Sequence, residues 1–282
     1  MGRRASLGLD RSNLAEHERA RAEGLEWSKK VVKQAFKGSK IKDRTGKLPH
    51  FDFDELKLGA VLGQGQFGDI SEVISFRVKG VQGQHKYRAN RPNKINYQAQ
   101  DSFDARTEQR QISAGEDARA FLAKHCIRKG GNPRYAVKVL SSKVITDTEK
   151  FLQGIQDMAI EGRILSDLDH PNIIKMRATA KVDAYNEYFF FVLDKLYQYL
   201  EDRMAEWHNR ASKKANPISN MFGKKSKPDS FNKELYKEKI SVMYDLSDAI
   251  RYCHSRHIMH RDIRPENVGF DVVSCYKKNN PD

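Results

Sequence analysis

The segment His260-Arg261-Asp262-Ile263-Arg264-Pro265-Glu266-Asn267 packs two carboxylates, two cations and an amide into eight residues. It follows a helical pattern and the apolar pair Ile258-Met259. In such a loop Asp262 can accept a proton from a hydroxyl nucleophile, Arg264 can neutralise a transferring phosphoryl group, and Asn267 can offer an oxygen to a metal ion. The alternative is a polar turn with incidental charges, and the density of these groups argues against it.

A glycine cluster lies between two strand-like segments within residues 56–78. It reads Gly63-Gln64-Gly65-Gln66-Phe67-Gly68 and is followed by Ile70. Because glycine has no side chain, backbone N–H groups can approach a polyphosphate here, and an aromatic tip can cover it. Glycine-rich turns are common, so this signal is weak by itself. Its place between strands argues against a dinucleotide-binding fold, in which the same spacing opens a helix.

Lys138 lies among apolar residues in a predicted strand at 135–140. A lysine that faces a core is costly unless its charge is paired. Glu161, on the predicted helix at 147–168, can supply the countercharge. Read alone, Lys138 also fits a solvent-facing lysine on an edge strand, and Glu161 an ordinary exposed helix charge.

The hydrophobic pattern predicts a sheet-rich part followed by a helical part. Strands are predicted as two segments within 56–78, then at 135–140, 173–176 and 188–193. Helices are predicted at 10–37, 116–128, 147–168, 195–204 and 233–254. The strand at 188–193 is nearly all apolar, so we expect it to be buried on both faces.

This pattern divides the chain into three regions. Residues 1–50 hold 13 Lys/Arg against 6 Asp/Glu, and we expect them to form a basic, partly disordered arm. Residues 51–193 form a first lobe with a polar insertion at 79–131. Residues 194–282 begin a second, helical lobe with a basic insertion at 208–230.

Charge and cysteine content narrow the class of protein. A formal net charge of +14 favours anionic partners such as a nucleotide, a phosphoprotein or an acidic lipid. No recognised nucleic-acid motif accompanies the basic clusters, so we expect no specific nucleic-acid partner. Three widely spaced cysteines and the lack of a long apolar run predict an intracellular protein, cytoplasmic or nuclear.

The glycine loop, the strand lysine, the helix glutamate and the H-R-D-x-x-x-x-N run together resemble the signature set of the eukaryotic protein kinase family. The match covers residues 56–271, interrupted by the insertions. It implies an α+β, bilobal protein-kinase-like fold with a complete small β-sheet lobe, one long helix and the first part of the helical large lobe. It also implies ATP and Mg²⁺ as cofactors and a protein substrate whose hydroxyl receives the γ-phosphoryl group. Arg264 stands where serine/threonine kinases usually carry lysine, so the resemblance favours serine/threonine specificity.

The resemblance assigns roles by position. It implies that Lys138 contacts the α- and β-phosphates while paired with Glu161, that Asp262 is the catalytic base supported by Arg264, and that Asn267 is a Mg²⁺ ligand. His260 and Arg261 would be architectural, and Phe189–Leu193 would lead into the hinge. The nucleotide-binding positions implied are Gly63, Gln64, Gly65, Gln66, Phe67, Gly68, Ile70, Ala136 and Lys138, with the backbone of Asp194 and Leu196 at the adenine edge.

The sequence departs from the family pattern after Asn267. Residues 268–282 contain no D-F-G, whose Asp holds the main Mg²⁺ ion in the family. We therefore expect a sequence cut short after Val272 at a gene-model or splicing boundary, which would bind ATP weakly and transfer phosphate poorly. The alternative is a pseudokinase-like regulatory module that binds nucleotide or partners. The complete set of Lys138, Glu161, Asp262 and Asn267 argues against that module, and the missing D-F-G argues for it.

The N-terminus carries two further signals. Met1-Gly2-Arg3-Arg4-Ala5-Ser6 fits the N-myristoylation pattern, and Arg3–Leu7 resembles a substrate site for basophilic kinases. Acylation of Gly2 would allow the basic arm to associate peripherally with a membrane, because one acyl chain needs a basic partner to anchor stably. A basic, disordered terminus without either modification is the alternative.

Overall fold

The computed structural model describes residues 11–79, 117–128, 130–212 and 229–271. Gly2 and Ser6, most of the insertion at 79–131, the centre of the basic insertion at 208–230 and the tail after Asp271 lie outside the described residues, and the expectations about them stay predictions. The chain divides into two compact units. The first unit comprises Met1–Arg77, Ala136–Asp167 and Met176–Leu193, and the second comprises Val78–Tyr135, Leu168–Lys175 and Asp194–Asp282.

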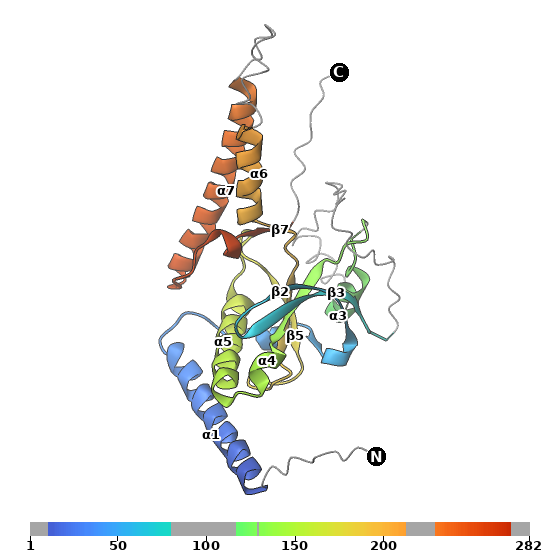
Figure 1. Ribbon diagram of the computed structural model, residues 1–282, viewed down its shortest axis with the longest axis vertical. Coiled ribbons are helices and arrows are strands. Elements are labelled where there is room, and N and C mark those ends of the chain that lie inside the picture. Colours follow the sequence, from blue (N-terminus) through green and yellow to red (C-terminus); the bar gives the residue numbers. More distant parts are fainter. Residues whose placement is uncertain (1–10, 80–116, 129, 213–228, 272–282) are drawn as a thin grey trace, which may run out of the picture. The chain divides into compact units, whose positions relative to one another are not determined.

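A six-stranded sheet forms the centre of the first unit, with the strand order β1-β5-β6-β4-β3-β2. Strands β2, β3 and β5 of this sheet are labelled in Figure 1. The strands are β1 (His50–Phe51), β2 (Leu56–Gln64), β3 (Gly68–Phe76), β4 (Tyr135–Leu140), β5 (Met176–Ala180) and β6 (Phe190–Asp194). The helices of this unit are α1 (Arg11–Ala35), α4 (Ser142–Ile145) and α5 (Thr148–Asp167), with short 3-10 turns η1 (Thr45–Lys47) and η2 (Phe53–Glu55). Phe51, Val137, Phe191 and Val192 are completely buried in its core.

The β2–β3 hairpin agrees with the two strands predicted around the glycine cluster. The strands are antiparallel, and Gly63 pairs with Ile70 and Gln64 with Asp69 at the end of the hairpin. The predicted strand at 135–140 and the predicted helix at 147–168 correspond to β4 and α5. With the sheet and its helices in one unit, the α+β fold class is confirmed.

The strand predicted at 173–176 is wrong. Ile173 still belongs to a turn, in which its N–H donates to the carbonyl of His170 (3.1 Å), and β5 begins only at Met176, where the chain pairs with Leu193 of β6. All residues of β5 are buried, because β6 and β1 flank it on both sides. The burial predicted for 188–193 is correct from Phe189 onward, whereas Tyr188 is 64% exposed.

Helix α1 packs along α5 in the same unit. The hydroxyl of Ser28 is buried between them, where it donates to the Gly24 carbonyl (2.8 Å) and accepts from the Gln156 side-chain amide (2.9 Å). The guanidinium of Arg21 lies 3.7 Å from the ring centroid of Phe151. Residues 11–35 are therefore an ordered part of the first unit.

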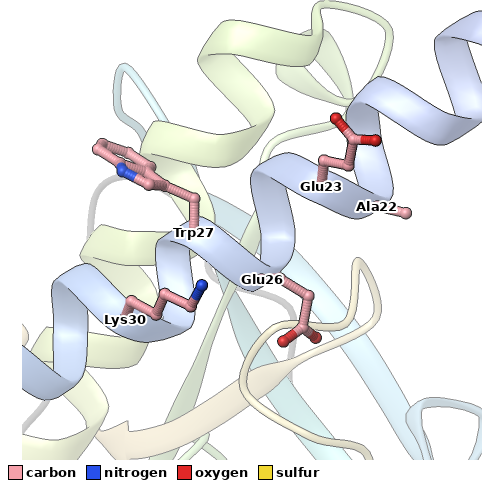
Figure 2. A pocket seen from close by; sticks show the side chains of 5 residues that line it. All are labelled: Ala22, Glu23, Glu26, Trp27 and Lys30. Atoms are coloured by element: carbon pink, nitrogen blue, oxygen red, sulfur yellow. The ribbon is translucent and has the colours of Figure 1, made fainter.

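The outer face of α1 carries a surface hollow. Figure 2 shows its five lining residues, which are Ala22, Glu23, Glu26, Trp27 and Lys30. The indole of Trp27 is 59% exposed. Because every lining residue comes from this one helix, the hollow is a groove on the helix surface and not a cleft between elements.

The second unit contains α3 (Ala118–Lys124), α6 (Leu200–Ser212), α7 (Asp229–Ser255), the 3-10 turn η4 (Pro265–Asn267) and a two-stranded sheet of β7 (Gln198–Tyr199) and β8 (Gly269–Phe270). Helix α3 is shorter than the predicted 116–128, and α6 begins five residues later than predicted. Helices α6 and α7 lie side by side around Leu200, Trp207 and Leu235 (Figure 1). None of the described helices combines the length and apolar character that a bilayer-spanning helix needs.

Docking of α1 can be tested at Val32, which is only 4% exposed. Val32→Ala should lower the free energy of unfolding by about 2 kcal/mol, because it removes two buried methyl groups and leaves a cavity. The matched control is Lys30→Ala, an exposed position on the same helix, which should change it by less than about 0.5 kcal/mol. Urea unfolding curves measure both, and equal stabilities would contradict the docking of α1.

Candidate active site

The glycine loop closes tightly at the end of the β2–β3 hairpin. The N–H of Gly65 donates to the carbonyl of Gly68 (2.8 Å), and residues 63–66 are exposed. A Cβ atom at Gly68 would lie 3.1 Å from Cε of Lys138 and 3.2 Å from the carbonyl oxygen of Val139. Glycine is needed at this position because the loop rests directly on the strand that carries the lysine.

The side chain of Phe67 packs against helix α5, whereas the sequence suggested an aromatic side chain at the tip of the loop that could cover a polyphosphate. A Cβ atom at Gly154 of α5 would lie 3.3 Å from Cβ of Phe67, so the side chain is half-buried against this helix. The carbonyl of Phe67 accepts from the N–H of Ser141 (2.8 Å), which fixes the loop to the end of β4. The ring therefore anchors the hairpin to α5 in this structure.

Lys138 and Glu161 form an ion pair between β4 and α5, in which Nζ donates to Oε2. The pairing that the sequence predicts is thus found, and neither residue is the solvent-facing charge of the alternative. The side chains are 24% and 36% exposed, so the pair is only partly shielded from solvent. Nζ also lies 6.0 Å from the ring centroid of Phe191, at the limit of a cation–π contact. Ala136 is buried on the same strand and Ile70 is half-buried on β3.

Asp157 is a member of this cluster that the sequence analysis missed. It precedes Glu161 by one helical turn, on the same face of α5. The pKa of Asp157 is raised. The larger cause is partial desolvation of its carboxyl group, and a further cause is the negative charge of Glu161. The positive charge of Lys138 opposes this shift without cancelling it. The only sequence signal was this four-residue spacing.

The hinge expected at Asp194 and Leu196 lies at the start of the second unit. The N–H of Asp194 donates to the carbonyl of Lys175 (3.1 Å), and the N–H of Lys195 donates to the carbonyl of Arg134 (2.9 Å). Within the described part of the chain, the backbone N–H and C=O of Leu196 have no hydrogen-bond partner. A residue whose backbone N–H and C=O are both unsatisfied can pair with the edge of a planar heterocycle.

The H-R-D loop brings Asp262 and Asn267 together. The amide nitrogen Nδ2 of Asn267 donates to the backbone carbonyl of Asp262 (2.9 Å) and to its carboxylate Oδ2 (2.7 Å). Arg261 has a positive φ of 63°, which turns the chain before the carboxylate, and Nδ1 of His260 accepts from the N–H of Asp262 (3.4 Å). Arg264 is exposed and pairs with Glu266 (3.4 Å). The side chain of Asp262 is exposed and is held in one orientation by Asn267.

The oxygen ligands offered here fit Mg²⁺, which prefers carboxylate and amide oxygens. Because Nδ2 of Asn267 makes both hydrogen bonds to Asp262, the amide oxygen Oδ1 is left without a donor among the described residues. No group of three or more His, Cys, Asp or Glu residues in the described ranges is arranged to hold a metal ion. Asn267 can therefore supply one ligand of a site that needs further oxygens.

A buried charge cluster supports this loop from α6 and α7. Glu238 bonds both Arg203 (3.0 Å) and Arg210 (2.7 Å), and the side chains of Glu238 and Arg203 are each 5% exposed. The guanidinium of Arg203 lies 4.9 Å from the ring of Phe270, in the strand that follows the loop. Desolvation pushes the pKa of Glu238 upward, but Trp207 and the two arginines outweigh it and hold the pKa below its usual value.

The first unit thus carries a glycine hairpin beside a paired lysine, and the second carries a loop in which Asn267 holds Asp262. The protein kinase domain family model matches residues 107–274, more than half of the chain. The chain belongs to the protein kinase family, and the family predicted from the sequence is confirmed. The glycine loop lies before the matched residues.

Individual relatives agree with the family. The chain is 30% identical over 155 residues to calcium-dependent protein kinase 5 of Plasmodium falciparum, which is 55% of this chain and 21% of that protein. It is 29% identical over 162 residues to Aurora/IPL1-related protein kinase 2 of Caenorhabditis elegans (56% and 41%). It is 27% identical over 153 residues to probable serine/threonine-protein kinase fhkD of Dictyostelium discoideum (54% and 17%).

The chain spans less than half the length of each of these relatives. They agree with the predicted class of enzyme, a protein kinase. The roles assigned to single residues, apart from the pairing of Lys138 with Glu161, stay predictions.

The cluster around Glu238 gives a stability prediction. Glu238→Ala should lower the free energy of unfolding by about 3 kcal/mol at pH 7, because buried Arg203 loses its buried partner and keeps only the more distant, exposed Glu206 (3.9 Å). Glu234→Ala, an exposed position on the same helix, should change it by less than about 0.5 kcal/mol.

The same cluster sets a pH dependence. Because the folded-state pKa of Glu238 is lowered, its contribution is complete above the usual value of 4.5 and is lost as the pH falls through the lowered pKa. The stability gap between wild type and Glu238→Ala should therefore narrow below about pH 4.5. Urea unfolding at several pH values measures it, and a gap that stays constant into that acid range would contradict the assignment.

Proposed function

We propose that this chain binds ATP together with Mg²⁺ and transfers the γ-phosphoryl group to a serine or threonine hydroxyl of a protein substrate. The observation that carries the proposal is the Lys138–Glu161 ion pair directly beneath a glycine hairpin. Family membership and the Asp262–Asn267 hydrogen bonds support it independently.

ATP binding follows from the chemistry of the first unit. The exposed turn at residues 63–66 has no bulky side chain at Gly63 or Gly65, so its backbone can approach phosphate oxygens closely. Glu161 holds Nζ of Lys138 in place, and an ammonium group positioned in advance binds a phosphate with little loss of side-chain entropy. In the second unit, the unsatisfied backbone groups of Leu196 would pair with the adenine edge, as the family resemblance implies.

Phosphoryl transfer is assigned to the catalytic loop. The carboxylate of Asp262, oriented by the Nδ2 of Asn267, would accept the proton of the substrate hydroxyl as the hydroxyl oxygen bonds to the γ-phosphorus. The bond from the γ-phosphorus to the β,γ-bridging oxygen breaks in the same transfer, and ADP leaves with that oxygen. Arg264 would lie near the transferring group and compensate its negative charge. A bound Mg²⁺ ion, with Asn267 among its ligands, would neutralise charge on the phosphates.

Binding and transfer need separate tests. In the family the main Mg²⁺ ligand is the Asp of D-F-G, and residues 268–282 do not contain that motif. The nucleotide site proposed above does not depend on it. A regulatory module that binds nucleotide without transferring phosphate is therefore the outcome that competes with the transfer proposal.

The binding test is calorimetric titration with ATP, with and without Mg²⁺. Lys138→Met should weaken ATP affinity by at least about tenfold, because a charge-assisted contact to the phosphates is lost. Lys143→Met removes an exposed lysine from α4 and should leave the affinity unchanged. Equal ATP affinities of wild type and Lys138→Met would contradict the proposed nucleotide site.

The transfer test uses radiolabelled ATP and a serine/threonine peptide mixture. Asp262→Asn should reduce phosphate incorporation by about 100-fold or more, because the general base is lost. Asp271→Asn, an exposed carboxylate in the segment that follows the loop, should retain the wild-type rate. ATP binding with no transfer by the wild-type chain would favour the regulatory module instead.

A further inference from the structure

Tyr197, the residue after Leu196, is bound by residues that precede β4 in the chain. The hydroxyl of Tyr197 donates to the backbone carbonyl of Pro133. The guanidinium of Arg128 lies 5.2 Å from the centroid of the Tyr197 ring, and Nζ of the buried Lys195 lies 4.7 Å from it. Tyr197 therefore makes a polar contact at its tip and cation–π contacts at its ring.

Backbone hydrogen bonds fix both neighbours of Leu196. The N–H of Lys195 donates to the carbonyl of Arg134 (2.9 Å), and the N–H of Tyr197 donates to the carbonyl of Phe270 in β8 (2.8 Å). Leu196 lies between these two anchors, and its own N–H and C=O have no partner in the described part of the chain. Its side chain packs on Gly269, where an added Cβ atom would lie 2.6 Å from Cδ1 of Leu196.

The residues on either side of Pro133 are hydrogen-bonded and buried. Ile127 and Pro133 form an isolated antiparallel bridge, and the N–H of Arg134 donates to the carbonyl of Cys126 (2.8 Å). The side chain of Arg134 adds a bond from Nε to the carbonyl of His125 (2.9 Å). Cys126 and Arg134 are almost completely buried. Pro133, which accepts the hydrogen bond of Tyr197, is therefore tied into the chain on both sides of the bridge.

We propose that Arg128 and Tyr197 form a clamp that positions the backbone of Leu196 for the adenine ring. The inference rests on the ATP binding proposed above and names positioning residues for that site. The clamp acts through Leu196, because neither Arg128 nor Tyr197 needs to touch the nucleotide. It gives the segment at 117–134 a function in nucleotide recognition.

The clamp makes a prediction that separates it from a general loss of stability. The clamp acts on recognition of the adenine ring, so a weaker clamp should reduce the affinity for adenosine and for ATP by the same factor. It should leave the affinity for inorganic tripolyphosphate unchanged. Lys138→Met should have the opposite pattern, because it removes a phosphate contact and leaves adenosine binding intact.

The test is calorimetric titration of the full chain with adenosine, ATP and tripolyphosphate, well below the unfolding temperature of each variant. Tyr197→Phe removes the hydroxyl and keeps the ring, and Arg128→Gln removes the cation. Each should weaken adenosine and ATP binding about 3- to 10-fold, the range expected for one hydrogen bond or cation–π contact. Tyr199→Phe, which removes a hydroxyl from a partly exposed tyrosine in β7, is the matched control and should bind like wild type.

The outcomes distinguish the clamp from the proposed function. If the wild type binds ATP and both Tyr197→Phe and Arg128→Gln keep the wild-type affinity for adenosine, the clamp is overturned. The proposal that the chain binds ATP is then unaffected. A lower unfolding temperature with unchanged affinity also overturns the clamp, because the contacts would then be merely structural. If the wild type binds neither adenosine nor ATP, both the proposed function and the clamp are overturned.

Discussion

A lysine on an inner strand needs an anion beside it, and that requirement organises the first unit around the Lys138–Glu161 pair. The glycine hairpin rests on the stem of Lys138 because Gly68 has no side chain. Helix α5 approaches the sheet closely at Gly154, where a Cβ atom would lie 2.6 Å from Leu140. Helix α1 then docks on α5, so one ion pair links the strand beneath the glycine hairpin to the helix on which α1 packs.

In the second unit the candidate polar side chains are exposed to solvent, and the charged groups that are buried around them are paired. Asn267 fixes the carboxylate of Asp262, and the buried Arg203–Glu238 pair supports the strand that follows. Leu196 is held on both sides while its own backbone groups stay available. The candidate functional groups are therefore held in place by residues that do not themselves need to contact a ligand.

The sequence predicted those features whose signal lies in adjacent residues. The glycine hairpin, β4 with Lys138 and the length of α5 follow from local apolar periodicity, and the pairing of Lys138 with Glu161 follows from the cost of a buried charge. Strand β5 was misplaced because its Ala-Thr-Ala end has weak strand propensity and is specified by pairing with β6. The docking of α1 depends on Gly24 and Ser28, small residues that leave no hydrophobic pattern. The contact of Arg128 with Tyr197 joins distant segments and had no sequence signal.

We propose that Glu161 acts by holding Lys138 in position for the phosphates of ATP. A double-mutant cycle with Lys138→Met and Glu161→Gln, measured as ATP affinity, tests it most directly. If the two residues act as a unit, the double variant should bind ATP about as weakly as Lys138→Met alone. Fully additive losses in the double variant would contradict the account, because the two side chains would then contribute independently.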